Sequence, residues 1–158
     1  MIKVKKHTEG DSRVAKELPS FWNFRNANKD HIEDVINLGK WFAMELQLRM
    51  AKHDYTKVTE PYESLFYRDL CAVIEGRMDF FDGEWSKLHY DVCERHHLKR
   101  HCPEDVNLFD VIEMLCDCVA AGMARSGEVY DVDVPQEVLI KAVANTVKLL
   151  KDEIEVVE

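Results

Sequence analysis

The sequence predicts an all-α protein whose 158 residues form a single domain. Apolar residues recur at spacings of three and four along several segments, which is the pattern of helices with one buried face. No segment alternates convincingly between apolar and polar residues with a period of two, so no strand is predicted. A chain of this length is also long enough to enclose one core.

Residues 1–29 form a mixed segment that we expect to dock on the helical core as an N-terminal extension. Pro19 interrupts it, and the aromatic side chains of Phe21, Trp22 and Phe24 are expected to make the docking contacts. Beyond it, Asp30 has a glutamate three residues later. This capping box predicts a helix from there to about residue 52.

The remaining chain predicts four more helices, each from an apolar stripe and its flanking start and stop residues. Pro61 lies in the first turn of the second helix, and Pro135 opens the last one. Asn107 is a candidate cap for the fourth helix, and Gly127 ends it. The predicted ranges are about 59–75, 84–97, 108–125 and 135–153.

Composition excludes several classes of protein. The net charge of −9 argues against a general nucleic-acid-binding surface, although a small anionic substrate remains compatible with it. No run of about 18 apolar residues and no signal peptide are present, so we expect a cytoplasmic protein that does not enter a membrane. Five cysteines without a CxxC spacing argue against a disulfide framework or a zinc knuckle. A homo-oligomer remains open, because exposed apolar residues cannot be told from core ones here.

The segment His53-Asp54-Tyr55-Thr56-Lys57 is the centre of the functional prediction. Six of the seven histidines fall between positions 31 and 101 and surround or follow this segment. Asp117 lies downstream in an apolar helical stretch, where a carboxylate needs a partner. Imidazoles and carboxylates together are the ligands of a divalent cation such as Mn, Fe, Co, Ni, Zn or Mg. The sequence therefore predicts a metal site.

These residues carry a resemblance to a known superfamily. His31, His53-Asp54 and Asp117 resemble the H…HD…D pattern of the HD superfamily of metal-dependent phosphohydrolases. Lys57, three residues after the aspartate, is similar to the HDxxK variant of that pattern. The resemblance implies a helical bundle of the HD-domain type that holds one or two divalent metals through these two histidines and two aspartates.

A second resemblance covers about residues 30–125. Small uncharacterised bacterial and phage proteins carry a similar HDxxK segment, then a His-His-Pro-like segment, then Glu-Met-x-x-Asp. The corresponding residues here are His96-His97 and Glu113 to Asp117. The chain departs from this pattern at Leu98, where proline is usual, and at Cys118, where tryptophan is usual. This resemblance implies the site without implying a substrate.

The predicted first helix conflicts with a shared metal. His31 lies in its first turn and His53 just beyond its end, so a straight helix would separate them by about 33 Å. Either the helix breaks within residues 37–41, where Asn37 and Gly39 are weak points, or His31 is not a ligand. The HD resemblance implies the break, because there the first histidine and the His-Asp pair come from different helices.

Further residues are candidates for catalysis and substrate binding. We interpret Lys57 as a phosphate anchor rather than a solvated lysine, and Glu113 either as a general base, as a group that holds a histidine ring, or as part of a solvated acidic face. The candidate catalytic residues are Lys57, Glu113 and His97. The candidate substrate-binding residues are Lys57, His89, His96, Arg95 and Arg100, with His101 left open.

The predicted chemistry is hydrolysis of a small phosphate ester or anhydride, most plausibly in a nucleotide. A divalent metal makes hydroxide available near neutral pH and neutralises charge on phosphoryl oxygens. Two alternatives use the same residues. One is a non-haem di-iron oxygenase of HD fold, and the other is a non-catalytic metal-binding or interaction protein.

Overall fold

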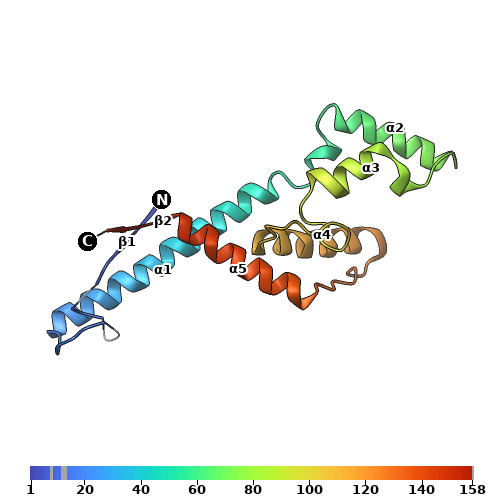
Figure 1. Ribbon diagram of the computed structural model, residues 1–158. Coiled ribbons are helices and arrows are strands. Elements are labelled where there is room, and N and C mark those ends of the chain that lie inside the picture. Colours follow the sequence, from blue (N-terminus) through green and yellow to red (C-terminus); the bar gives the residue numbers. More distant parts are fainter. Residues whose placement is uncertain (8, 12–13, 158) are drawn as a thin grey trace. The chain divides into compact units, whose positions relative to one another are not determined.

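The computed structural model describes residues 1–7, 9–11 and 14–157. This part of the chain is mostly helical, as the sequence predicted, and contains a small two-stranded sheet as well. Among the described residues, no helix combines the length and the apolar character needed to cross a membrane. The helices are α1 (Phe21–Met50), α2 (Tyr62–Ile74), α3 (Glu84–Leu88), α4 (Leu108–Ser126) and α5 (Gln136–Asp152), and the strands are β1 (Ile2–Lys5) and β2 (Ile154–Val157) (Figure 1).

The chain divides into two compact units, where the sequence analysis expected one domain. The first unit combines Met1–Gln47 with Val147–Glu158, and the second is the continuous stretch Leu48–Thr146. Of the predicted site residues, only His31 belongs to the first unit. The second unit therefore contains all the other candidate site residues.

The first unit contains the sheet that the sequence analysis missed. β1 and β2 pair in parallel, with Ile2 opposite Ile154 and Lys5 opposite Val157 (Figure 1). In β1 the isoleucine and valine are half-buried and the lysines are exposed, so the strand does alternate. Four residues are too few for this period to stand out from chance in a sequence, which explains the wrong prediction.

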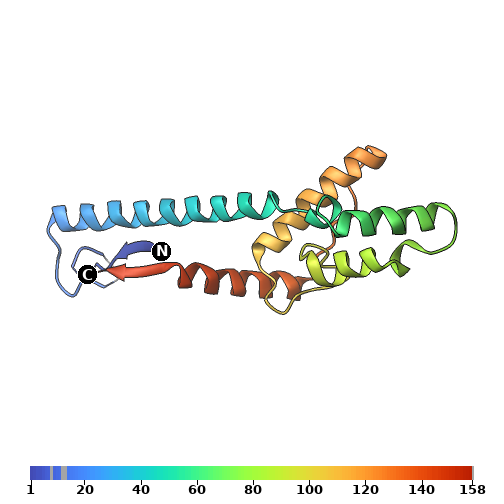
Figure 2. The same ribbon diagram turned by 90° about the horizontal axis from the view of Figure 1, so that it is seen from above.

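Helix α1 begins nine residues before the predicted start. The hydroxyl of Ser20 accepts a hydrogen bond from the Asn23 backbone N–H at 3.1 Å, which caps the helix ahead of Asp30. The helix then continues unbroken to Met50, without the break expected within 37–41 (Figure 2). The predicted docking of the aromatic residues is wrong, because Phe21, Trp22 and Phe24 are 68%, 65% and 45% exposed on the first turn of α1.

The core of the second unit lies around α4 and the first part of α5. Its fully buried apolar members are Leu98, Val106, Val111, Met114 and Ala142. Thr146 ties the two helices together, because its hydroxyl accepts a hydrogen bond from the Leu108 backbone N–H at 2.8 Å. This packing fixes α4, which carries the carboxylates of Glu113 and Asp117.

Helices α2 and α3 lie side by side in the same unit (Figure 1). The ring of Phe66 stacks on that of Trp85 with centroids 3.9 Å apart. The carboxylate of Asp69 accepts a hydrogen bond from the Trp85 backbone N–H at 2.8 Å, which joins the two helices in the interior. Gly83 permits this approach, because a Cβ there would lie only 2.8 Å from Oδ2 of Asp69.

The helix predicted over residues 84–97 is much shorter than expected. α3 ends at Leu88, a single π-helical turn follows over His89–Cys93, and Glu94 has an extended backbone. His89 and His96 therefore do not share one helix face, as their spacing of seven suggested. His96 instead reaches the site from the irregular segment that precedes α4.

Candidate metal centre

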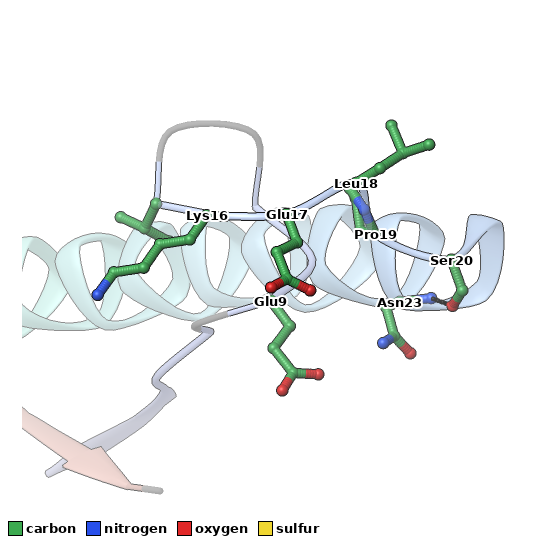
Figure 3. A pocket seen from close by; sticks show the side chains of 8 residues that line it. Glu9, Lys16, Glu17, Leu18, Pro19, Ser20 and Asn23 are labelled. Atoms are coloured by element: carbon green, nitrogen blue, oxygen red, sulfur yellow. Dashed lines mark hydrogen bonds between the residues drawn. The ribbon is translucent and has the colours of Figure 1, made fainter.

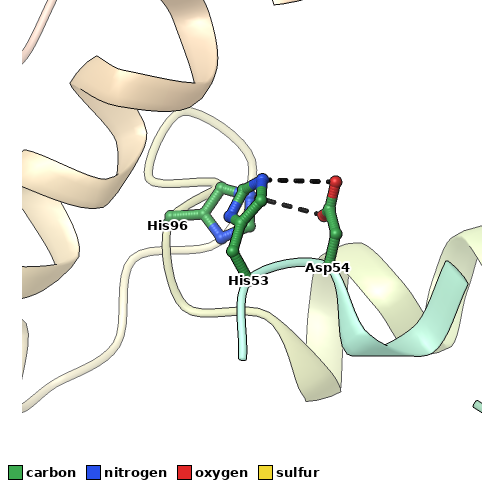
Figure 4. A group of neighbouring side chains, drawn as sticks. All are labelled: His53, Asp54 and His96. Carbon is green, nitrogen blue, oxygen red and sulfur yellow. Dashed lines mark ion pairs between the residues drawn. The ribbon is translucent and has the colours of Figure 1, made fainter. Parts of the chain in front are cut away.

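The turn after α1 places the His53-Asp54 pair. Asp54 has φ of 55° and ψ of 28°, in the left-handed region that aspartate tolerates better than most residues. A 3₁₀ turn, Tyr55–Lys57, follows directly. This reversal turns the Asp54 carboxylate toward the rings of His53 and His96 (Figure 4).

Four side chains from three segments form the first ligand group. Nε2 of His53 lies 3.3 Å from Oδ2 of Asp54 and 3.6 Å from Oδ1 of Asp117. Nε2 of His96 lies 3.8 Å from Oδ1 of Asp54 and 4.0 Å from Oδ2 of Asp117. Donor atoms of His53, Asp54 and His96 meet the distance requirement for a common ion, and Asp117 meets it together with His96 and His97.

A second group shares Asp54 with the first. Nε2 of His89 lies 3.4 Å from Oδ1 of Asp54 and 2.9 Å from Nε2 of His97. These atoms of Asp54, His89 and His97 meet the distance requirement for a common ion, as do those of His53, Asp54 and His96. Oδ1 of Asp54 thus faces a histidine of each group, and Oδ2 faces His53 of the first.

The separations between these donor atoms fit a transition metal or magnesium. Two ligands that are each about 2.1 Å from one ion, at octahedral or tetrahedral angles, are about 3.0–3.4 Å apart. Several of the observed separations are in or close to this range, and the ligand atoms of each set of three residues named above lie within 4.8 Å of one another. Only small side-chain movements are needed to bring the atoms to ligand distance.

Three buried atoms of the site have no hydrogen-bond partner. They are Oδ1 of Asp54 and both ring nitrogens of His96, a side chain that is 1% exposed. Buried polar atoms are nearly always hydrogen-bonded, so such a cluster needs an explanation. A bound cation would supply a partner for Oδ1 and for Nε2, so the residues fit a metal.

Glu113 contacts both imidazoles of the first group. Its Oε1 lies 3.0 Å from Nδ1 of His53 and 3.2 Å from Nδ1 of His96. Because the same carboxylate contacts both rings, it orients both Nε2 atoms toward the aspartates. Glu113 and Asp117 are one turn apart on α4, so a single helix face presents both.

The carboxylates of the site hold their charge despite burial. Burial raises the pKa of Glu113, but its contacts with the imidazoles of His53 and His96 outweigh burial and lower the pKa to about 2. Burial also opposes ionisation of Asp54, yet His53 and Lys57 hold its pKa well below the usual range. The hydrogen bond with His53 lowers the pKa of Asp117. The site therefore gathers negative charge that requires compensation.

The pKa values of the imidazoles are shifted in opposite directions. Hydrogen bonds to Asp117, Asp54 and Glu113 raise the pKa of His53 to about 11. Burial lowers the pKa of His89 to about 4 and that of His97 to about 3. The latter two rings are neutral at pH 7, the state in which imidazole binds metals, whereas a cation would displace the proton of His53.

Not all predicted residues join these groups. His31 is exposed in the third turn of α1, and no ligand group found among the described residues includes it. The unbroken helix favours the alternative in which His31 is not a ligand. His96, rather than His31, lies beside His53 and Asp54.

The predicted basic residues have other partners. The Arg95 guanidinium contacts the buried Asp110 through two nitrogens at 2.9 Å, and also pairs with Asp105. Arg100 pairs with the exposed Asp91 and lies over the ring of Tyr90. Lys57 is at the site itself, where its ammonium contacts Asp54. His101 is exposed and belongs to none of the ligand groups found in the described residues.

Sequence reasoning missed two residues that contact the ligands. Thr56 is buried with its hydroxyl 2.7 Å from Nδ1 of His89, and the ring of Trp85 stacks on the same imidazole at 4.4 Å. The signal for Trp85 was present, because it precedes His89 by four residues, the spacing at which helical side chains meet. Thr56 lies inside the His53–Lys57 segment, where only the outer residues suggested a function.

Two hollows differ in chemistry. One of about 170 Å³ borders the first ligand group and is lined by Met50, His53, Glu113, Cys116, Asp117 and Ala120. Another, of about 650 Å³, belongs to the first unit (Figure 3). Its lining, which includes Glu9, Lys16 and Glu17, has no imidazole or thiol. The smaller hollow is therefore the one that gives access to the candidate metal ligands.

Comparisons with known proteins identify the family without identifying the activity. The sequence profile described as "Family of unknown function (DUF5662)" matches residues 20–155. Searches among curated proteins and among solved structures found no match. The match includes every ligand of both groups, so the site lies within the part of the chain that defines the family.

Proposed function

The chain belongs to the DUF5662 family, and we propose from its own residues that it is a divalent-metal-dependent phosphohydrolase with an HD-like site. Its substrate is a small phosphate ester or anhydride, such as a nucleotide. The observation that carries the proposal is the proximity of His53, Asp54, His96 and Asp117 to one another, with buried atoms among them that lack hydrogen-bond partners. His96 replaces His31 in the proposed ligand set.

The proposed chemistry divides among the residues of the site. A bound divalent cation supplies a Lewis acid for water and for phosphoryl oxygens. Lys57 lies beside Asp54 with a third of its side chain exposed, so its ammonium can contact an incoming phosphate. Glu113 keeps the rings of His53 and His96 in orientation. In hydrolysis a bond forms between water oxygen and phosphorus, and the bond to the leaving group breaks.

We propose that Asp117, besides belonging to the ligand set, accepts the proton that the attacking water loses. It borders the small hollow and its side chain is 27% exposed, so water can approach it. The proton then passes to the leaving group or to solvent. The other carboxylates are engaged differently, because Glu113 holds two rings and Asp54 contacts Lys57, His53 and His89.

A specific observation also favours a second candidate. The two ligand groups share Asp54, and this arrangement has enough donors for two ions. Imidazoles with a shared carboxylate suit a pair of irons, so a di-iron oxygenase is the alternative function. Oxygen consumption by the iron-loaded protein would separate it from a hydrolase.

The test is metal analysis followed by a nucleotide hydrolysis panel. We expect the wild-type protein to bind at least one divalent ion per chain and to release phosphate only when that ion is present. Asp54→Asn keeps the shape of the side chain but removes its charge, and should lose both properties. Asp79→Asn, at an exposed position in the turn before residues 80–82, is the matched control and should retain both.

Three results would contradict the ligand assignment or the phosphohydrolase function. Full metal stoichiometry in Asp54→Asn would contradict the ligand assignment. Metal binding with oxygen consumption and no phosphate release would favour the oxygenase. A well-folded wild-type protein that binds no divalent ion would leave the non-catalytic interaction protein as the remaining class.

A further inference from the structure

We propose that Thr56 is a positioning residue that aims His89 at the metal centre. Its hydroxyl holds the imidazole so that Nε2 faces Asp54 and His97. The inference rests on the proposed function and extends it, because it assigns His89, from the second ligand group, to the cation as well. It adds a residue that neither the sequence analysis nor the family assigns to the site.

The contacts around His89 leave its ring a single orientation. Thr56 is 1% exposed, and its Oγ1 lies 2.7 Å from Nδ1 of His89. The ring of Trp85 stacks on a face of the His89 imidazole, with the two centroids 4.4 Å apart and an interplanar angle of 19°. The stacking fixes the plane of the imidazole, and the hydrogen bond fixes which edge of the ring faces the aspartate.

The backbone of Thr56 also holds the stacking partner. Its carbonyl oxygen accepts a hydrogen bond from Nε1 of Trp85 at 3.0 Å. One threonine therefore contacts both His89 and Trp85 within the buried part of the site. Since Thr56 follows Asp54 by two residues, the same turn supplies the shared carboxylate and the group that orients its imidazole partner.

The chemistry of the hydroxyl explains why threonine suits this position. A hydroxyl can donate or accept a hydrogen bond. The hydrogen bond that one ring nitrogen of a histidine makes determines which of its two nitrogens carries the proton. When Thr56 accepts the Nδ1–H of His89, the lone pair of Nε2 is directed toward Oδ1 of Asp54 at 3.4 Å. The same atom then faces Nε2 of His97 at 2.9 Å. This tautomer is the one that can bind a cation there.

A purely structural role for Thr56 predicts a different result. In that case the methyl group would matter and the hydroxyl would not, so valine would replace threonine without loss of metal binding. Serine tests the reverse, because it keeps the hydroxyl and lacks the methyl group. The pair of variants therefore separates orientation of the imidazole from packing.

The experiment is calorimetric titration of chelator-treated full-length protein with Zn²⁺. We expect Thr56→Ser to bind Zn²⁺ with nearly wild-type affinity and Thr56→Val to lose about 10- to 100-fold, the usual effect of removing a partner of a metal-bound histidine. Thr59→Val, at an exposed threonine in the next turn, is the control and should bind as the wild type does. Circular dichroism checks that each variant is folded.

Nitrogen NMR of the histidine rings supplies a readout that does not depend on the valine variant. In Zn²⁺-loaded wild-type and Thr56→Ser protein, His89 should carry its proton on Nδ1. A proton on Nε2 would overturn the proposal, as would wild-type Zn²⁺ affinity in folded Thr56→Val or failure of the wild-type protein to bind Zn²⁺. Zn²⁺ binding with the expected variant order but without phosphate release would support this inference while contradicting the hydrolase.

Discussion

Asp54 is the residue through which the site is connected. Its carboxylate lies within 4.0 Å of nitrogens from His53, His89 and His96, and it also contacts Lys57. The left-handed backbone at Asp54 costs about 1–3 kcal/mol in a non-glycine residue, and such strain is concentrated at functional sites. The strained turn therefore lowers the stability of the folded protein and places one carboxylate among several imidazoles.

A second buried aspartate, Asp69, stabilises the frame behind the site. Burial by itself would raise its pKa, but the Trp85 backbone N–H and the Arg68 guanidinium outweigh this and lower the pKa below the usual value. The folded state thus favours the ionised form. Its contribution is complete above the unfolded pKa of about 4 and is lost as the pH falls through the lower folded value.

Asp69→Asn should therefore destabilise the protein in a pH-dependent way. At pH 7 we expect a loss of about 1.5–3 kcal/mol, the range for a hydrogen bond to a charged group. Urea unfolding at several pH values should show the difference from wild type shrinking as the pH falls from about 4 through the lower folded pKa, because the unfolded carboxylate binds a proton first and the folded one last. Asp79→Asn serves as the exposed control. A difference that stays constant down to acid pH would contradict the assigned charge.

At the scale of elements, α4 places two carboxylates by means of its N-terminal cap. Oδ1 of Asn107 accepts a hydrogen bond from the Phe109 backbone N–H at 3.0 Å, and Asp110 accepts one from the Asn107 backbone N–H at 2.9 Å. Glu113 and Asp117 follow in the next two turns on the same face. The cap thus fixes where the helix begins and, through its period, where these side chains lie.

Removing the cap should weaken the helix without removing a ligand. Asn107→Ala is expected to cost about 1 kcal/mol of unfolding free energy, whereas Asn107→Gly should cost only a few tenths. Chemical denaturation of both variants checks the order, and Zn²⁺ titration checks that the folded variants still bind the ion. An alanine variant as stable as the wild type would show that the cap contributes little to α4.

For the whole molecule, local signals predicted some elements better than others. The fourth and fifth predicted helices agree with α4 and α5 to within one or two residues, because Asn107, Gly127 and Pro135 mark their ends. α1 starts early because Ser20 caps it, although the capping box at Asp30 looked stronger in the sequence. The two four-residue strands are paired across the length of the chain, and no local pattern reports such a pairing.

The sequence predicted the kinds of side chain that form the candidate site, but not every individual residue. The types of His53, Asp54 and Asp117 indicated a cation, and the structure brings these three together. His96 could not be chosen over His31 from spacing, because it approaches along an irregular segment rather than a helix face. Only tertiary structure reveals which histidine such a segment brings to the aspartates.

Metal removal should lower the stability of the unit that contains the site. An ion that binds only the folded state adds about 2.7 kcal/mol when its free concentration is 100 times the Kd. For a chain of this size, that corresponds to a fall of about 5–11 °C in Tm after chelation. Calorimetry of wild-type protein with and without EDTA measures this change in Tm. The Tm of Asp54→Asn should not change when EDTA is added. Because both ligand groups lie within Leu48–Thr146, an equal shift in Asp54→Asn would mean that the ion binds elsewhere.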